Sequence, residues 1–203
     1  MRAGSWQKFV SLLVWTGLSL PLLIMIGQAI TGHLGPDPAK ALVDSSGLWT
    51  IRLLWLTLAM TPLRIITGMN GWVRYRRRLG LGALFYACIH LSCYAVFFLE
   101  GEWVALVREI VKRPYIVVGF MAWLLLLPLG LTSTRQWQRK LGHNWLRLHK
   151  AVYLIAFLAL IHFIWLKKLG IWAVWPYALL LLVMMALRTP VIKRAIQSAR
   201  INK

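Results

Sequence analysis

Residues 148–166 read LHKAVYLIAFLALIHFIWL, an apolar run in which the only charged residue is one lysine. A helix rises 1.5 Å per residue, so about 20 residues cross the ~30 Å hydrocarbon core of a membrane. The run shows no strict alternation of apolar and polar residues, which argues against a strand of a transmembrane barrel. It therefore predicts a transmembrane helix.

Five further runs of similar character flank this one. They cover residues 9–30, 48–66, 79–99, 115–131 and 171–187. We predict an all-α integral membrane protein, in which residues 1–203 form a single domain, a bundle of six transmembrane helices. The first run is longer than the core of a secretory signal, and we expect it to be retained. The longest loops are expected at residues 31–47 and 100–114, and we identify no internal repeat.

Basic residues are distributed unequally between the two sides of the predicted bundle. Of the 24 Lys and Arg residues, 17 lie on the side that holds both termini, and all five acidic residues lie on the other side. The acidic residues are Asp37, Asp44, Glu100, Glu102 and Glu109. The positive-inside rule then predicts that both termini are cytoplasmic. The basic face suits anionic lipid headgroups. The chain has no basic stripe with interleaved aromatic residues, so we do not expect it to bind nucleic acid.

Three histidines, His90, His149 and His162, lie within or at the edge of these runs. An imidazole in hydrocarbon is costly unless it has a partner, so such residues are candidates for function. The third and fifth runs cross in the same direction, which places His90 and His162 at similar depth in the outer half. Two neutral imidazoles on facing helices can fill both axial positions of a haem iron. The spacing therefore predicts a haem between them.

His149 and an arginine cluster form a second, inner level. His149 lies 13 residues before His162, about 20 Å along a helix, and Arg76 has a comparable depth on the third run. His149 could bind a second haem or contact headgroups. Arg76 could be its opposite ligand or, with Arg77 and Arg78, bind phosphate or propionate groups. Thirteen residues leave an ideal helix about 140° from the same face, so either the helix is distorted or His149 leans in from the first turn. Tryptophans near the ends of the runs, such as Trp145, are expected at membrane interfaces.

Residues 141–153, LGHNWLRLHKAVY, resemble the Leu-Gly-x-x-Trp-x-x-Leu-His-x-x-Val-Tyr segment of the MsrQ (YedZ) family. Shorter similarities follow the same order along the chain. They lie at residues 35–38, 61–64, 77–80, 90–94, 113–115, 132–134 and 162–165. The resemblance covers about residues 5–190, and its broader relatives are the ferric-reductase-like transmembrane domains.

The resemblance implies a multi-pass subunit of the bacterial inner membrane that carries one or two b haems. It implies that His90, His149 and His162 bind haem iron and that the protein can carry FMN, for which the sequence offers no motif. Such proteins take electrons from quinol, or from a cytoplasmic flavin reductase. They pass them to a periplasmic molybdopterin partner, MsrP, which reduces methionine sulfoxide in oxidised envelope proteins. The acidic outer loops would dock this partner in a heterodimer, and the sulfoxide chemistry would reside in the partner.

The residues alone leave other functions open. One is a haem-containing transmembrane ferric or quinone reductase with another acceptor. Another is a non-haem proton or ion transporter that uses the histidines as a relay, or a scaffold without a cofactor. A transporter predicts acidic residues within the membrane, and the six runs contain none.

Overall fold

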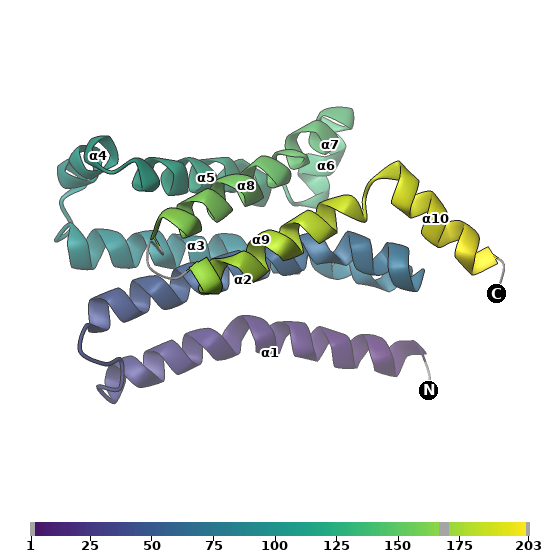
Figure 1. Ribbon diagram of the computed structural model, residues 1–203. Coiled ribbons are helices and arrows are strands. Elements are labelled where there is room, and N and C mark those ends of the chain that lie inside the picture. The colour runs from purple at the N-terminus through teal and green to yellow at the C-terminus, as the bar shows by residue number, and fades with distance from the viewer. Residues whose placement is uncertain (1–2, 167–170, 202–203) are drawn as a thin grey trace.

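A computed structural model describes residues 3–166 and 171–201, and every regular element within them is a helix. Long helices lie alongside one another as a bundle (Figure 1). They are α1 (Ala3–Ile30), α2 (Pro38–Thr67), α3 (Arg76–Phe98), α5 (Pro114–Leu131), α8 (Ala151–Leu166) and α9 (Ile171–Ala186). Five helical spans are long and apolar enough to cross a membrane, or six if α9 and the bent α10 (Pro190–Ile201) count as one. The predicted all-helical, multi-pass architecture is confirmed.

Short helices lie at the two ends of the bundle. They are the 3-10 helix η1 (Asn70–Tyr75), α4 (Trp103–Lys112), α6 (Arg135–Leu141) and α7 (His143–His149). In Figure 1, α6 and α7 lie at the end where α1 begins and α10 ends, and α4 lies at the opposite end. The arginine-rich segments 76–78 and 135–150 therefore share one end of the bundle, and the acidic residues around α4 share the other. We call these the basic end and the acidic end.

The predicted loop at residues 31–47 is wrong over its second half, because α2 begins at Pro38. The Asp37 carboxylate caps this helix by accepting a hydrogen bond from the Lys40 backbone N–H at 2.9 Å. Proline is tolerated in the first turn, where its missing N–H would have no helical partner. The 30 residues of α2 reach about 45 Å, longer than the hydrocarbon core, and carry its first turns to the level of the outer histidines.

The predicted loop at residues 100–114 is also wrong, because it contains α4. This ten-residue helix is amphipathic and too short to cross a membrane. Its length and pattern are typical of a helix that lies along a membrane surface.

The interior of the bundle is formed mainly by α2, α3, α5 and α8. α2 packs most extensively against α3, and α5 against α8. Leu54 and Leu58 of α2, Tyr86 of α3 and Ile155 of α8 are almost completely buried. Large apolar side chains cover the outer surface as well, as expected where helices meet lipid rather than water.

Candidate functional site

The structure brings His90 of α3 and His162 of α8 together. Their ring centroids are 6.2 Å apart, and the ring planes are inclined at 80°. A metal–imidazole bond of about 2 Å, plus about 1 Å from nitrogen to ring centre, gives roughly 6 Å between two rings that share one metal. The separation therefore fits two imidazoles that would bind one metal atom.

Backbone carbonyls hold both rings by the same nitrogen. His90 Nδ1 lies 2.9 Å from the Val43 carbonyl, and His162 Nδ1 lies 2.7 Å from the Tyr115 carbonyl. Because a carbonyl can only accept, each Nδ1 carries the proton and donates it. The Nε2 lone pair of each neutral ring is then free to bind a metal, as is typical of ligating histidines.

Glycines let these rings lie directly against the neighbouring helices. A Cβ atom at Gly47 of α2 would lie 3.0 Å from the Cε1 and Nδ1 atoms of His90. At Gly119 of α5 it would lie 2.7 Å from the same atoms of His162. No other residue type leaves room for the ring at Gly119 without a shift of the ring or the helix.

The two halves of the outer site have equivalent contacts at the same spacing along the chain. Adding 72 to the positions of Val43, Gly47 and His90 gives 115, 119 and 162, the positions of the equivalent carbonyl, glycine and histidine. Apolar helices resemble one another in composition. In the sequence, therefore, only the glycine and the histidine of each half mark the equivalent positions. The same shift relates His149 to position 77, where the chain has arginine.

The ligand set suits haem better than a bare metal ion. Within the part of the chain that the structure describes, no group of three or more His, Cys, Asp or Glu side chains is placed to hold a metal. A structural zinc site needs four ligands from the protein, whereas a haem macrocycle supplies four nitrogens and leaves two positions. Two histidines are therefore sufficient for haem.

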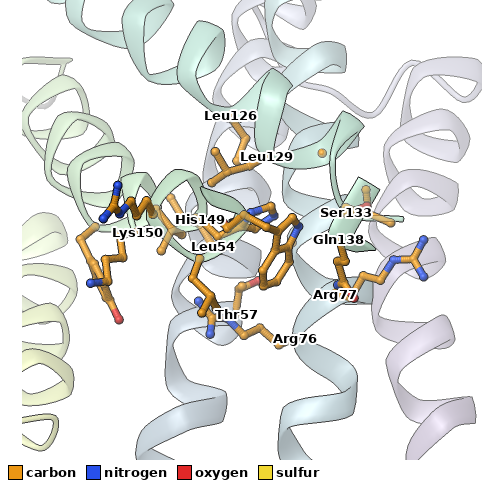
Figure 2. A pocket seen from close by; sticks show the side chains of 18 of the residues that line it. Leu54, Thr57, Arg76, Arg77, Leu126, Leu129, Ser133, Gln138, His149 and Lys150 are labelled. Carbon is orange, nitrogen blue, oxygen red and sulfur yellow. Dashed lines mark hydrogen bonds between the residues drawn. The ribbon is translucent and has the colours of Figure 1, made fainter. Parts of the chain in front are cut away.

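A cavity of about 820 Å³ lies at the basic end (Figure 2). Its lining includes the apolar side chains of Leu54, Leu126 and Leu129, together with Arg76 and His149. These residues come from α2, α5, α3 and α7. The volume lies within the range of about 300–1,000 Å³ that cofactor pockets occupy.

Trp145 fixes the His149 ring at the edge of this cavity. The Trp145 carbonyl lies 3.1 Å from His149 Nδ1, and its indole stacks on the imidazole with centroids 3.9 Å apart. The indole Nε1 in turn donates to the Thr132 carbonyl at 2.9 Å. Trp145 and His149 both line the cavity. The prediction of an interfacial Trp145 missed this contact.

The fifth span is distorted at Lys150, between α7 and α8. The Lys150 N–H donates to the Arg147 carbonyl at 3.2 Å, and the Tyr153 N–H to the Lys150 carbonyl at 3.1 Å. Such bonds to the third residue back wind the chain by about 120° per residue instead of about 100°. The extra rotation reduces the mismatch between His149 and His162, so the distorted helix is the correct one of the two predicted alternatives.

The three predicted arginines lie in different environments. Arg76 is half-buried and Arg77 is exposed; both line the cavity, and their side chains diverge in Figure 2. Arg78 faces α1 instead: its Nη1 donates to the Ser11 hydroxyl at 2.6 Å. The structure therefore does not bring Arg78 to the cavity.

Comparisons with known proteins show which proteins the chain resembles. The family described as ferric reductase like transmembrane component matches residues 46–160. A protein of Xanthomonas axonopodis pv. citri is 48% identical over 163 residues, which cover 80% of this chain and 75% of the relative. One from Xanthomonas campestris pv. campestris is 54% identical over 135 residues, 66% of this chain and 62% of the relative. Both are described as the protein-methionine-sulfoxide reductase heme-binding subunit MsrQ. No solved structure matches the chain.

Proposed function

Because the chain belongs to the MsrQ family of haem-binding subunits, within the ferric-reductase-like transmembrane proteins, we propose that it carries electrons across a membrane. The observation that carries this proposal is the His90–His162 pair, with ring centroids 6.2 Å apart on facing helices. Bound haem supplies a one-electron iron couple. If His90 and His162 both bind the iron, no position would remain for a substrate, which favours electron transfer over catalysis.

We assign the outer haem to His90 and His162, and a second b haem to the cavity beside His149. Electrons would enter from the cytoplasmic side at the level of His149 and leave at the level of His90 and His162. Quinol, or a flavin reductase, is the proposed donor. If FMN is the inner carrier, its phosphate would bind the exposed Arg77 and Arg147 at the cavity.

The acidic end is the proposed docking face for the electron acceptor. Glu100 and Glu102 are exposed there, next to α4. In a bacterial inner membrane with both termini cytoplasmic, this end faces the periplasm. A periplasmic molybdopterin reductase of the MsrP kind would dock there, take the electrons and reduce methionine sulfoxide.

Transmembrane electron transfer in liposomes tests this function. Haem-loaded protein is reconstituted with ferricyanide sealed inside, and a quinol or dithionite is added outside. We expect ferricyanide to be consumed by the native protein and by His33→Ala, an exposed loop variant, but not by His162→Ala. Equal rates of ferricyanide consumption for all three proteins would contradict the proposal. Consumption with dithionite but not with quinol would exclude quinol as the donor.

A further inference from the structure

Arg188 lies in the turn between α9 and α10, with its guanidinium turned into the bundle. Its Nη2 donates to the Leu58 carbonyl of α2. That carbonyl lacks a helical partner because Pro62, four residues later, has no N–H. The Nε and Nη1 atoms of Arg188 are buried and have no hydrogen-bond partner among the described residues.

The surroundings of Arg188 are positively charged and adjoin the cavity. Its guanidinium carbon lies 5.2 Å from the centre of the Tyr153 ring, and Arg76 is a neighbouring positive charge. Tyr153 and Arg76 both line the cavity. Arg188 therefore lies directly behind the cavity wall.

No acidic side chain is available to neutralise this group. The chain has five Asp and Glu residues, and all belong to the acidic end, around the start of α2 and around α4. Arginine stays protonated in proteins, so it cannot relieve its burial by losing a proton. Arg188 is half-buried, and an anion from outside the chain would satisfy its buried Nε and Nη1 donors.

We infer that Arg188 binds a carboxylate of the ligand that occupies the adjoining cavity. The inference rests on the proposed function: the ligand is the inner haem, and the carboxylate is one of its propionates. A free N–H donor of a guanidinium can form a charge-assisted hydrogen bond to a carboxylate oxygen. The contact would also join the α9–α10 turn to the cofactor site, and so hold α10 at the basic end.

Haem dimethyl ester, in which both propionates are uncharged, provides the test. Full-length haem-free protein carrying His162→Ala is titrated with haem and with the ester, so that only the inner site takes the ligand. With Arg188 present, we expect the ester to bind at least about tenfold more weakly than haem, as for loss of a charge-assisted hydrogen bond. In Arg188→Gln we expect haem itself to bind about tenfold more weakly and the preference over the ester to disappear.

Arg194→Gln is the matched control. Arg194 is exposed on α10, and its replacement by glutamine removes the same charge as Arg188→Gln. Arg188→Lys keeps the charge and should retain part of the preference, which separates lost binding from misfolding. An unchanged preference in Arg188→Gln would overturn the inference alone. Failure of the Arg188-containing protein to bind any haem would overturn the inner haem site as well.

A lipid phosphate is the other anion that could reach Arg188, and membrane composition distinguishes it. The titrations are repeated in nanodiscs of phosphatidylcholine with and without phosphatidylglycerol. A propionate contact predicts the same effect of Arg188→Gln in both. Weaker haem binding by Arg188→Gln only in nanodiscs that contain phosphatidylglycerol, with the preference for haem over the ester unchanged, would mean that Arg188 binds lipid. This result would overturn the inference.

Discussion

His90 and His162 each combine a donated Nδ1 proton, a free Nε2 and a glycine on the facing helix. Each part serves the ligand role: the carbonyl fixes the tautomer, and the glycine allows the ring to approach the neighbouring backbone. An interhelical hydrogen bond alone would account for one such histidine. It would not account for two rings at a separation that fits one metal atom.

Replacing either outer histidine should remove the outer haem. We expect His90→Ala and His162→Ala to lose the same part of the haem absorbance while the protein stays folded, because each removes one of two axial ligands. The measurement is the amount of haem per polypeptide in detergent, with His33→Ala as the control variant. Full retention of haem in either variant would show that the pair does not hold the iron.

Gly119→Ala should disturb the outer site more than Gly47→Ala. The new Cβ would lie 2.7 Å from the His162 ring at Gly119 but 3.0 Å from the His90 ring at Gly47. We expect lower haem occupancy in the first and a smaller loss in the second. Gly17→Ala is the control, since nothing lies within 4 Å of its Cβ position. Equal occupancy in all three variants would mean that the close approach is not required.

The histidines could be predicted from the sequence because a polar ring is conspicuous among apolar residues. Gly47, Gly119 and Arg188 could not. A glycine in a membrane helix is common, and only the three-dimensional contact shows which ring it accommodates. Arg188 belongs to a basic tail in sequence, and its burial depends on a carbonyl left free by Pro62 on another helix.

Among the helices, the outer extension of α2 has the largest effect on the site. Its first turns place the Val43 carbonyl beside His90, and Asp37 caps them. The sequence predicted a loop here because residues 31–47 are too polar for hydrocarbon, although nothing prevents a helix from continuing into water. Hydropathy identifies the membrane-embedded part of a helix, and capping residues determine where it begins.

Removal of the α2 cap should loosen this extension. Asp37→Ala is expected to cost about 1 kcal/mol of local stability, so amide hydrogen exchange at residues 39–46 should quicken about fivefold. Glu102→Ala is the control, because Glu102 occupies the same position before α4 without a side-chain cap hydrogen bond. Unchanged exchange in Asp37→Ala would mean that other contacts hold the first turns.

Across the whole molecule, the basic and acidic ends give the bundle a direction. The spans and their charge asymmetry were predictable because hydrophobic length and loop charge are read directly from composition. The α7–α8 distortion and the packing of α2 on α3 and of α5 on α8 depend on backbone hydrogen bonds and side-chain contacts, which composition does not reveal.

Cysteine labelling tests the orientation of the bundle. In a background with Cys88 and Cys93 replaced by alanine, Glu102→Cys should react with a membrane-impermeant maleimide in cells whose inner membrane is intact. Arg139→Cys, exposed on α6 at the basic end, should react only after permeabilisation. The reverse pattern would place the termini outside and reverse the proposed direction of electron flow.

The proposed function requires that this bundle hold haem between facing histidines. The most direct measurement is the dithionite-reduced minus oxidised visible spectrum of the purified native protein, with haem per polypeptide determined on the same sample. We predict a sharp b-type α band and up to two haems per chain. A folded protein, produced with ample haem, that shows no α band would contradict it.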